Sequence, residues 1–435
     1  MRSTPYLCFY GDDFTGSADV LDSLASAGIR TVLFLALPDE SMLRKLENVE
    51  AIGVAGMSRT MTPEEMASAL PPIFRWMAAS GASILHYKIC STFDSSPRRG
   101  SIGKAMDIAA ELGTALIPIL VGVPALGRYC VFGSLFARAG AASEVYRLDR
   151  HPVMSLHPVT PMVEADLRRH LSLQTNMSIG LVSVIDIETN TLPSEDTGKQ
   201  GNRLGVLFDT ISTDHLKTVG QWLHRYADHL AQPLFCVGSS AVEYALLEKW
   251  PGKNNRVVPR EYATVGNGAP IAVVSGSCSA ITARQIDFAA ARDFELVPLS
   301  IIALNSADAA QEARRRAVRT ALSALERGRS PLVYTSHGES DPGFGNALHA
   351  GQVLGCILRE IVDATQINRV AVAGGDTSGY VAQRLEIKAL EVAAPISPGA
   401  PLCKAHRVGG RALEIALKGG QMGSDDYFVR VRDAA

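Results

Sequence analysis

The sequence predicts an α/β protein of two domains, each a mainly parallel sheet flanked by helices, with a cleft between them. Short apolar runs alternate with amphipathic segments along the chain, which is typical of βαβ units. The 435 residues exceed the size at which a single hydrophobic core stops growing. A stretch rich in proline, glycine and asparagine, residues 251–269, interrupts the alternation. We therefore expect this stretch to be a linker and hinge between a domain of residues 1–250 and a domain of residues 270–435.

Local patterns place the elements of the first domain. The expected strands are residues 6–10, 31–36, 51–56, 83–89, 116–121, 204–210 and 234–238. The expected helices are residues 16–28, 63–79, 101–112, 161–173, 214–228 and 240–250. The start of the second helix is the most clearly marked, because Thr62 is a capping residue, Pro63 suits the first helical position, and Glu64 and Glu65 place acids in the first turn.

The second domain repeats the alternation after the linker. Its expected strands are residues 271–275, 295–299, 331–335 and 369–373. Its expected helices are residues 280–292, 307–327, 346–365 and 377–390.

Composition narrows the class of function. With 42 basic and 44 acidic residues the net charge is −2, so there is no basic surplus to bind nucleic acid or an anionic membrane. The seven cysteines are scattered without a CxxC pair, which argues against a disulfide framework and against a structural zinc site. No signal-peptide pattern and no stretch of about 18 apolar residues occurs, so the cytoplasm is the expected location.

Two adjacent carboxylates, Asp12 and Asp13, follow the first predicted strand in the turn Gly11-Asp12-Asp13-Phe14-Thr15-Gly16. The carboxyl ends of parallel strands are where open α/β sheets bind ligands. Paired acids there suit proton abstraction, or the binding of polyhydroxylated substrates and metal ions. The alternative is that the two residues only cap the helix that follows.

Further polar groups follow other strands of the first domain. Arg59 comes after strand 51–56, and its guanidinium can bind a carboxylate through two parallel hydrogen bonds; the alternative is an ordinary surface arginine. Lys88 lies at the end of strand 83–89, and a hydroxyl-rich loop beginning at Ser91 then enters a helix. Because free amides at a helix N-terminus bind anions, these residues together predict an anionic, hydroxylated ligand.

Glycine-rich turns mark the second domain. Ser275-Gly276-Ser277-Cys278-Ser279 and Ala373-Gly374-Gly375-Asp376-Thr377-Ser378-Gly379 each join a predicted strand to a helix, and Lys418-Gly419-Gly420-Gln421-Met422-Gly423 lies near the C-terminus. Glycines let the backbone approach phosphate closely, so the set favours a nucleotide over simple turn chemistry. Neither GxxxxGK[ST] nor a GxGxxG after a strand is present, so a kinase here must use phosphate loops of its own.

Together these motifs resemble the four-carbon acid sugar kinase family over nearly the whole chain. The resemblance is carried by GDDFTGSAD, YKICSTFDSSPRRGSIG, SGSCS, GGDTSG and KGGQMGSDDYF. It implies an N-terminal substrate domain, a C-terminal ATP domain, and phosphorylation of the terminal hydroxyl of threonate, erythronate or a 2-oxo-tetronate. Mg²⁺ is expected to bridge the ATP phosphates. The implied substrate residues are Asp13 with Asp12 beside it, Arg59, Lys88 and Ser91, and the implied nucleotide residues are Ser277, Gly374, Gly375, Asp376, Thr377, and Gly420 or Gly423.

Roles follow from charge. Arg59 would hold the substrate carboxylate, Asp12 or Asp13 would accept the proton of the attacking hydroxyl, and Lys88 would offset charge on the carboxylate or on the transferring phosphate. Asp376 would be a direct or water-mediated partner of Mg²⁺. The segment 123–128, Val-Pro-Ala-Leu-Gly-Arg, departs from the family's more usual asparagine-glycine-arginine form, which leaves the preferred acid open.

Two other classes of function stay open. One is a sugar-acid dehydratase or aldolase that uses the acidic pair with a metal and no nucleotide, and the other is a non-catalytic sugar-acid binding protein. The stereoisomer preferred and the oligomeric state, for which a homodimer is one option, are not encoded in these motifs.

Overall fold

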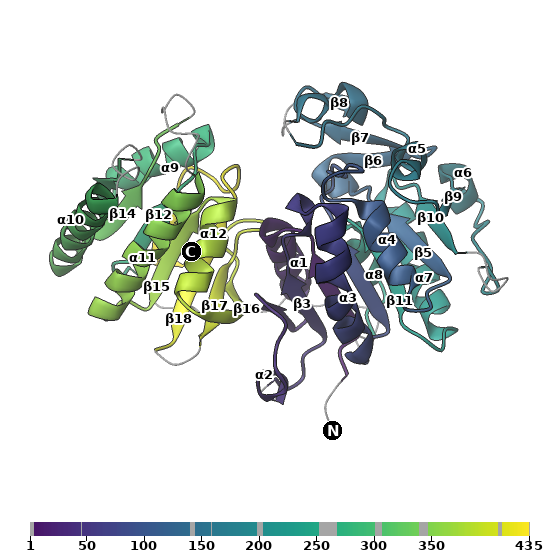
Figure 1. Ribbon diagram of the computed structural model, residues 1–435, viewed down its shortest axis with the longest axis horizontal. Helices are drawn as coiled ribbons and strands as arrows, with labels where there is room; N and C mark the ends of the chain where they lie inside the picture. Colours follow the sequence, from purple (N-terminus) through teal and green to yellow (C-terminus); the bar gives the residue numbers. More distant parts are fainter. Residues whose placement is uncertain are drawn as a thin grey trace. The chain divides into compact units, whose positions relative to one another are not determined.

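The chain folds into two compact units in a computed structural model that describes residues 4–44, 46–139, 144–157, 159–197, 203–251, 268–300, 307–338, 347–407 and 411–434. One unit comprises Met1–Thr31 and Leu37–Pro259, and the other comprises Val32–Ala36 and Arg260–Ala435. Each is a mainly parallel sheet flanked by helices (Figure 1), which confirms the predicted fold class. Most of the predicted linker, 252–267, lies outside the described residues, so its role as a hinge stays a prediction.

The sheet of the first unit is parallel throughout. Its strands are β1 (Leu7–Gly11), β3 (Ala51–Ala55), β4 (Ile84–Lys88), β5 (Leu116–Leu120), β9 (Ser178–Val182), β10 (Leu204–Phe208) and β11 (Leu234–Gly238). They lie in the order β3-β1-β4-β11-β5-β10-β9. The central strands β1, β4 and β11 are buried along their whole length. Burial on both faces explains why β1 and β11 read as uninterrupted apolar runs, whereas β4 also buries His86 and Lys88. Strand β9 was not predicted.

Helices of the first unit flank this sheet. They are α1 (Phe14–Ser26), α2 (Glu40–Arg44), α3 (Pro63–Ala79), α4 (Ile102–Ala110), α5 (Leu167–Ser172), α6 (Val184–Glu188), α7 (Thr213–Asp228) and α8 (Ala241–Leu247). The predicted start of α3 is confirmed, because Thr62 and Glu65 form a reciprocal capping box. The predicted helix 161–173 is wrong in its first half: the helix begins after Asp166, whose carboxylate accepts from the backbone N–H of Arg168 at 3.0 Å.

A small antiparallel sheet, which was not predicted, is inserted after β5. It consists of β6 (Arg128–Val131), β7 (Ser134–Arg138) and β8 (Val145–Arg147). The buried carboxylate of Asp209 fastens the turn between β6 and β7 to the main sheet, since it accepts from the backbone N–H groups of Phe132 at 2.6 Å and Gly133 at 2.9 Å. This attachment fixes the position of Arg128 at the start of β6.

The sheet of the second unit is parallel over one part and antiparallel over the rest. Its strands are β12 (Ala272–Ser275), β13 (Phe294–Pro298), β14 (Ser330–Tyr334), β15 (Arg369–Ala373), β16 (Ile387–Ala394), β17 (Leu402–Arg407), β18 (Leu413–Lys418) and β2 (Thr31–Phe34). The run β13-β14-β12-β15-β18 is parallel, and β17, β16 and β2 continue it with antiparallel pairings.

The helices of the second unit cover both faces of its sheet. They are α9 (Ala280–Ala290), α10 (Ala307–Glu326), α11 (Ala347–Ala364), α12 (Gly375–Arg384) and α13 (Tyr427–Asp433). Helices α10, α11 and α12 pack side by side on one face (Figure 1). Helix α9 packs against α13, and their side of the sheet holds a core that includes Ile286, Phe294 and Phe428, each nearly or fully buried.

Two expectations for the second unit need correction. The predicted helix 377–390 ends at Arg384, because Glu386 takes a left-handed backbone angle (φ +56°) and turns the chain into β16. Strands β16, β17 and β18 were not predicted at all. Their alanine, leucine and lysine content favours helix locally, whereas pairing in the sheet buries Ile387, Ala389 and Val392 on β16.

Strand β2 comes from the N-terminal part of the sequence but belongs to the sheet of the second unit. Leu33 lies opposite Leu390 and Phe34 opposite Ala389 on β16, and the backbone N–H of Leu35 donates to Lys388 O at 2.9 Å. From the sequence, residues 31–36 were expected among the strands of the first domain, and this assignment is wrong for β2. The four apolar or β-branched residues of β2 predict a buried strand, but nothing in them selects the partner.

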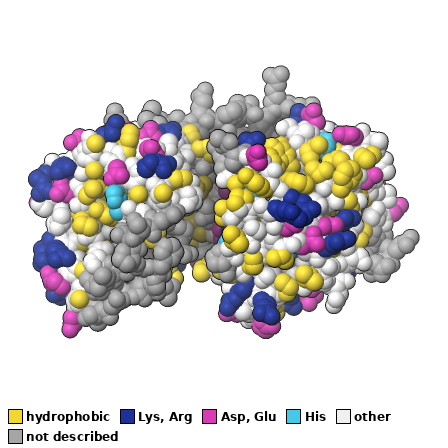
Figure 2. All heavy atoms as spheres, turned by 90° about the horizontal axis from the view of Figure 1, so that it is seen from above, with side chains coloured by type: hydrophobic (Ala, Val, Ile, Leu, Met, Phe, Trp, Pro, Cys, Tyr) yellow, Lys and Arg dark blue, Asp and Glu magenta, His cyan; other side chains and the backbone are white. Residues whose placement is uncertain are grey.

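Two surface properties agree with the composition. Within the described ranges, no helix combines the length and the apolar character needed to cross a bilayer. On the face shown in Figure 2, Lys and Arg side chains are interspersed with Asp and Glu on both units, so that face offers no continuous basic surface.

Candidate functional site

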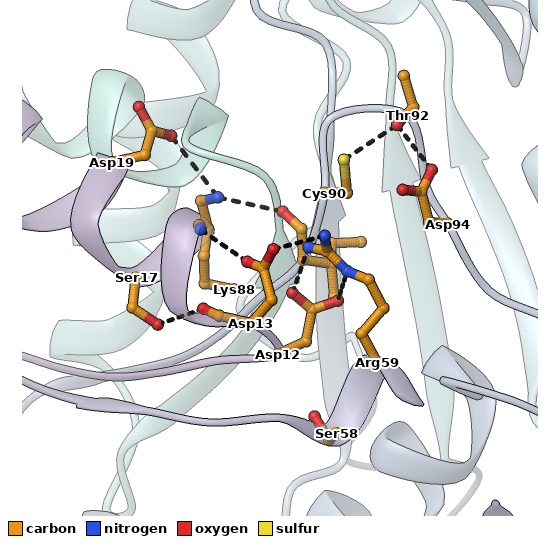
Figure 3. Close-up of polar contacts among 12 residues, drawn as sticks. Asp12, Asp13, Ser17, Asp19, Ser58, Arg59, Lys88, Cys90, Thr92 and Asp94 are labelled. Atoms are coloured by element: carbon orange, nitrogen blue, oxygen red, sulfur yellow. Dashed lines mark hydrogen bonds and ion pairs between the residues drawn. The ribbon is translucent and has the colours of Figure 1, made fainter. Parts of the chain in front are cut away.

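Four charged side chains converge at the carboxyl ends of neighbouring strands in the first unit (Figure 3). Strand β1 lies between β3 and β4, with Gly11 in register with both Ala55 and Lys88. The chain beyond these ends is held together by the backbone, since the N–H of Asp12 donates to Lys88 O at 2.8 Å and the N–H of Arg59 donates to Asp12 O at 3.0 Å. The structure therefore brings together Asp12, Asp13, Arg59 and Lys88, as the sequence predicted.

Asp13 has two contacts, one structural and one to Arg59. It is the N-cap of α1: its Oδ1 accepts from the backbone N–H of Gly16 at 2.6 Å. Its Oδ2 accepts from Arg59 Nη1 at 2.6 Å, and the side chain remains 27% exposed. The capping alternative is thus correct for Asp13, but capping accounts for only one of its two carboxylate oxygens. Gly16 is required here, because a Cβ would lie 2.6 Å from Oδ1.

The carboxylate of Asp12 accepts two hydrogen bonds from the guanidinium group of Arg59. Arg59 Nε donates to Asp12 Oδ2 at 3.1 Å and Nη2 donates to Oδ1 at 2.7 Å. The side chain of Asp12 is only 4% exposed, and burial raises its pKa to about 6 even though Arg59 opposes that shift. The parallel hydrogen bonds that the sequence analysis assigned to a substrate carboxylate are therefore made to Asp12 in this structure.

Lys88 is a buried ammonium with donors to spare among its described contacts. Its Nζ donates to Ile89 O at 3.2 Å and lies 3.6 Å from Asp19 Oδ2 on α1. Burial opposes its charged form, but Asp19, Glu243, Asp13 and Asp12 outweigh that effect and leave its pKa above the ordinary value. An ammonium carries three hydrogens, so Lys88 can still bind an anion that enters this site.

Behind Lys88 on the same strand, His86 forms a fully buried pair with Glu243. His86 Nδ1 lies 2.6 Å from Glu243 Oε1, and Nε2 lies 3.0 Å from Gly238 O. Because a carbonyl oxygen can only accept, Nε2 carries a hydrogen, and the pair shares one further proton. This pair sits in the core beneath the strand ends and was not identified from the sequence.

The loop after β4 continues the site. Thr92 Oγ1 donates to Asp94 Oδ1 at 2.7 Å and contacts Cys90 Sγ at 2.9 Å, and the predicted site residue Ser91 is partly exposed between them. Arg128, at the start of β6, interacts electrostatically with this loop. Burial lowers the pKa of Arg128, while Cys90 and Asp94 act in the opposite direction. The atypical segment 123–128 therefore ends at a residue whose charge senses the predicted substrate loop.

In the second unit, three glycine-containing turns meet at the ends of neighbouring parallel strands. Strand β15 lies between β12 and β18, with Ala373 in register with both Ser275 and Lys418. The turns are joined through the backbone: the N–H of Gly276 donates to Ala373 O at 3.0 Å, and that of Gly374 donates to Lys418 O at 2.9 Å. The structure thus brings the three predicted nucleotide segments to one edge of the sheet.

Close approach explains the glycines. A Cβ at Gly276 would lie 2.3 Å from Thr377 Oγ1, and one at Gly420 would lie 2.6 Å from Ser277 Oγ. Gly374 has φ +118°, a region that residues with side chains rarely adopt. The three turns are therefore closely packed against one another through Ser277, Gly374, Thr377 and Gly420. Gly423, with φ +85°, lies against Tyr427 at the end of the last turn.

Two helices begin at this edge with N–H groups directed toward it. Helix α9 starts after its N-cap Ser279, and α12 starts at Gly375 after Gly374. Free amides and the helix dipole at such ends favour phosphate. The donor set and the glycine cradle fit a nucleotide polyphosphate. The side chain of Asp376 lies outside the described residues, so its predicted role toward Mg²⁺ stays a prediction.

Metal ligands are sparse in the part of the chain that the structure describes, where no three His, Cys, Asp or Glu side chains converge. A nucleotide-bound Mg²⁺ needs only one or two carboxylates, because phosphates and waters supply its remaining ligands.

Sequence reasoning missed one residue of this edge. Lys418, the last residue of β18, is 2% exposed, and its Nζ donates to Thr282 Oγ1 at 3.0 Å and to Gly419 O at 3.1 Å. The signal was present in the motif Lys418-Gly419-Gly420, but a lysine at the end of a strand reads equally well as a solvated residue.

Comparisons with known proteins fit both sites. Residues 7–246 match the family model of a sugar-binding N-terminal domain, and residues 272–428 match that of a nucleotide-binding C-terminal domain. A 3-oxo-isoapionate kinase of Paraburkholderia graminis is 40% identical over 98% of this chain and 94% of its own. A 3-oxo-tetronate kinase of Pseudomonas fluorescens is 30% identical over 98% of this chain and 96% of its own.

Solved structures share the fold. A protein of Salmonella typhimurium described as a putative tRNA synthase superposes with a TM-score of 0.79 at 24% identity over 98% of each chain. A Haemophilus influenzae protein superposes with a TM-score of 0.75, also at 24% identity, over 97% of this chain and 98% of its own. At this level of identity the likeness concerns the fold alone.

Proposed function

We propose that this chain, which belongs to the four-carbon acid sugar kinase family and is a phosphotransferase acting on a hydroxyl group, transfers the γ-phosphoryl group of ATP to the terminal hydroxyl of a 3-oxo sugar acid. The names of the relatives support the 3-oxo group. Because identity is 40% to the 3-oxo-isoapionate kinase and 30% or less to 3-oxo-tetronate kinases, we rank 3-oxo-isoapionate first and 3-oxo-tetronate second.

The observation that carries the proposal is the unequal exposure of the two neighbouring carboxylates. Asp13 is 27% exposed, whereas Asp12 is 4% exposed with both oxygens bonded to Arg59. We therefore assign Asp13 as the group that orients the acceptor hydroxyl and takes its proton while the new O–P bond forms and the bond from the γ-phosphorus to ADP breaks. Each oxygen of Asp13 keeps a lone pair for this, since each accepts one described hydrogen bond.

The remaining charges of the first unit would hold the acid. Arg59 acts by fixing Asp12 and Asp13, so its role shifts from gripping the substrate to positioning the base. Lys88, with spare donors, is the better candidate to bind the substrate carboxylate or to offset charge on the transferring phosphate. Arg128, whose pKa is affected by Cys90 and Asp94 of the substrate loop, would bind the part of the acid that differs between substrates.

The second unit would bind the polyphosphate. The amides at the starts of α9 and α12 and the turns at Ser277, Gly374 and Gly420 would surround the phosphates. Mg²⁺, brought in with ATP, supplies charge neutralisation there, with Asp376 and Thr377 as its proposed partners.

The decisive experiment measures ADP release in a coupled assay with a panel of acids. The panel contains 3-oxo-isoapionate, 3-oxo-tetronate, 2-oxo-tetronate, threonate and erythronate at equal concentrations. We expect the highest kcat/KM with a 3-oxo acid. If none of these acids raises ADP release above the background ATPase rate, the substrate class is wrong.

A binding measurement separates the other classes of function. Calorimetric titration with ADP should show binding, because a dehydratase or aldolase of this fold would need no nucleotide. Binding of a 3-oxo acid and ADP together without phosphorylated product would instead support a non-catalytic binding protein.

A further inference from the structure

The buried ammonium of Lys418 has only neutral partners among the described residues. Its Nζ donates to Thr282 Oγ1 at 3.0 Å and to Gly419 O at 3.1 Å, and Gly420 O lies at 3.5 Å. The ring of Tyr427 lies 5.8 Å away. The side chain is 2% exposed. A buried charge without a counter-ion is costly, so a chain that keeps one here gains something from it.

Lys418 joins two of the three turns that meet at this edge. Thr282, which accepts from Lys418, is placed with its own hydroxyl 3.0 Å from both Ser277 Oγ and Gly420 O. The turn after Lys418 is also tied to α9 by Gln285, whose Nε2 donates to Met422 O, Gly423 O and Ser424 O at 3.0–3.1 Å. The backbone of both turns is thus positioned by a hydrogen-bond network that includes the ammonium of Lys418.

Among the described residues of the surrounding elements, no carboxylate forms an ion pair with Lys418. On α9 and the last turn, Arg284 pairs with Asp425, and Asp287 on α9 pairs with His337. On β15 and β18, Arg369 pairs with Glu414, which precedes Lys418 by four residues, or roughly 13 Å of strand. The other titratable groups in the sequence of these elements and of β17, α12 and α13 are Cys278, Asp376, Tyr380, Arg384, Cys403, Lys404, His406, Arg407, Asp426, Tyr427, Arg430, Arg432 and Asp433; of these, His406 pairs with Glu391 and Arg432 with Asp433.

We propose that Lys418 is the cation on which nucleotide affinity of the second unit depends, fastening the Gly419–Gly420 turn to α9 and supplying the positive charge that the polyphosphate meets there. The inference rests on the proposed function in taking ATP or ADP as the ligand. Lys418 is a positioning residue, because its donors are spent on the protein and its charge acts through the turn.

Because Lys418 is buried at this edge, we expect nucleotide binding to be coupled to the binding of a proton. Burial lowers the pKa of Lys418 to about 8. Below that pH the ammonium is charged, and above it the amine is neutral and its attraction for phosphate is lost. A bound polyphosphate favours the charged form, so nucleotide binding near pH 8 should raise this pKa and take up a proton.

Isothermal titration of the full-length protein with ADP and Mg²⁺ tests the proposal. For the wild type, we expect affinity to fall roughly tenfold between pH 7 and pH 9. At pH 8, titrations in two buffers of different ionisation enthalpy should show uptake of a fraction of a proton. Lys418→Arg should bind ADP without that uptake, because arginine stays charged throughout this range.

Two further variants give the size and the specificity of the effect. Lys418→Met should weaken ADP binding by at least about tenfold, the scale of a lost charge-assisted interaction. Lys404→Met, on the neighbouring strand β17 and exposed, should bind as the wild type does.

The outcomes are distinguishable. An affinity of the wild type that is flat from pH 7 to pH 9, or equal proton uptake by wild type and Lys418→Arg, overturns the inference. These readings do not depend on whether Lys418→Met folds. If the wild type binds no ADP at all, the proposed function fails instead.

Discussion

The candidate sites at the strand ends of the two units consist of different chemical groups. In the first unit the site is made of side chains of opposite charge, Asp12, Asp13, Arg59 and Lys88, which contact or face one another. In the second unit the corresponding edge is made of backbone amides, glycines and hydroxyls around the buried ammonium of Lys418.

This difference matches the ligands proposed for each unit. A sugar acid offers stereochemically distinct hydroxyls and one carboxylate, which are told apart by directed side chains. A polyphosphate offers many equivalent oxygens. Backbone amides and a helix N-terminus can bind these oxygens without contacting the rest of the nucleotide. Substitutions should accordingly act on charge and geometry in the first unit and on close packing in the second.

The largest effect is expected from Asp13→Asn. Asparagine keeps the cap of α1 but cannot accept the proton of the hydroxyl, so kcat should fall by about 100-fold or more while ADP affinity is unchanged. Steady-state kinetics with the best acid and ADP titration measure the two quantities. Asp39→Asn, exposed and remote in the sequence from the cluster, is the control. Turnover near the wild-type rate would remove Asp13 from the proposed role.

A substitution in the second unit should act on the other ligand. In Gly276→Ala the added Cβ would meet Thr377 Oγ1 at 2.3 Å, so the turn must shift. We expect the KM for ATP to rise roughly tenfold, as local strain of 1–3 kcal/mol implies, with the KM for the acid unchanged. Gly379→Ala in α12 is the matched control, because its Cβ would meet nothing within 4 Å. Equal effects of the two substitutions would contradict the close-packing argument.

The pH profile should depend on the charged cluster of the first unit. Because burial raises the pKa of Asp12 to about 6, Asp12 is neutral below that pH and its ion pair with Arg59 is lost. We expect kcat/KM to fall about tenfold for each pH unit below 6. Lys88 stays charged over this range, since its pKa is raised. A flat profile between pH 5 and pH 8, with the fold intact by circular dichroism, would be inconsistent with this assignment.

The smallest effect on activity is expected from a substitution in helix α3, which should change stability alone. Thr62→Ala removes half of the capping box of α3 and should lower the free energy of unfolding by about 1 kcal/mol. Both KM values and kcat should stay unchanged, since α3 supplies no residue to either proposed site. Thr62→Ser retains the hydroxyl and should recover the stability. Denaturant titration measures the change, and a loss of activity at full stability would argue against a purely structural α3.

The sequence predicted the positions of the site better than its contacts. Asp12, Asp13, Arg59 and Lys88 could be found because each follows an apolar run, and parallel neighbours bring such ends together. That Arg59 binds Asp12 rather than lying open could not be predicted, because pairing depends on which strands are adjacent. Lys418 was missed for a similar reason: its burial arises from α9, which lies far away in the sequence.

The fold shows the same limit. Parallel strands with helices between them were found from local periodicity. Strands β16, β17 and β18 were missed because their composition favours helix until sheet pairing outweighs it.

Strand β2 has a consequence for how this protein is made. Thr31–Phe34 emerges from the ribosome early, but its partner strand Ile387–Ala394 is translated more than 350 residues later. The apolar segment Thr31–Phe34 therefore cannot pair with β16 until most of the chain has been synthesised. A fragment that starts after residue 269 would lack this segment and would leave β16 as an open edge of the sheet. Expressing the nucleotide half alone thus calls for supplying residues 31–36 as a fused or added peptide.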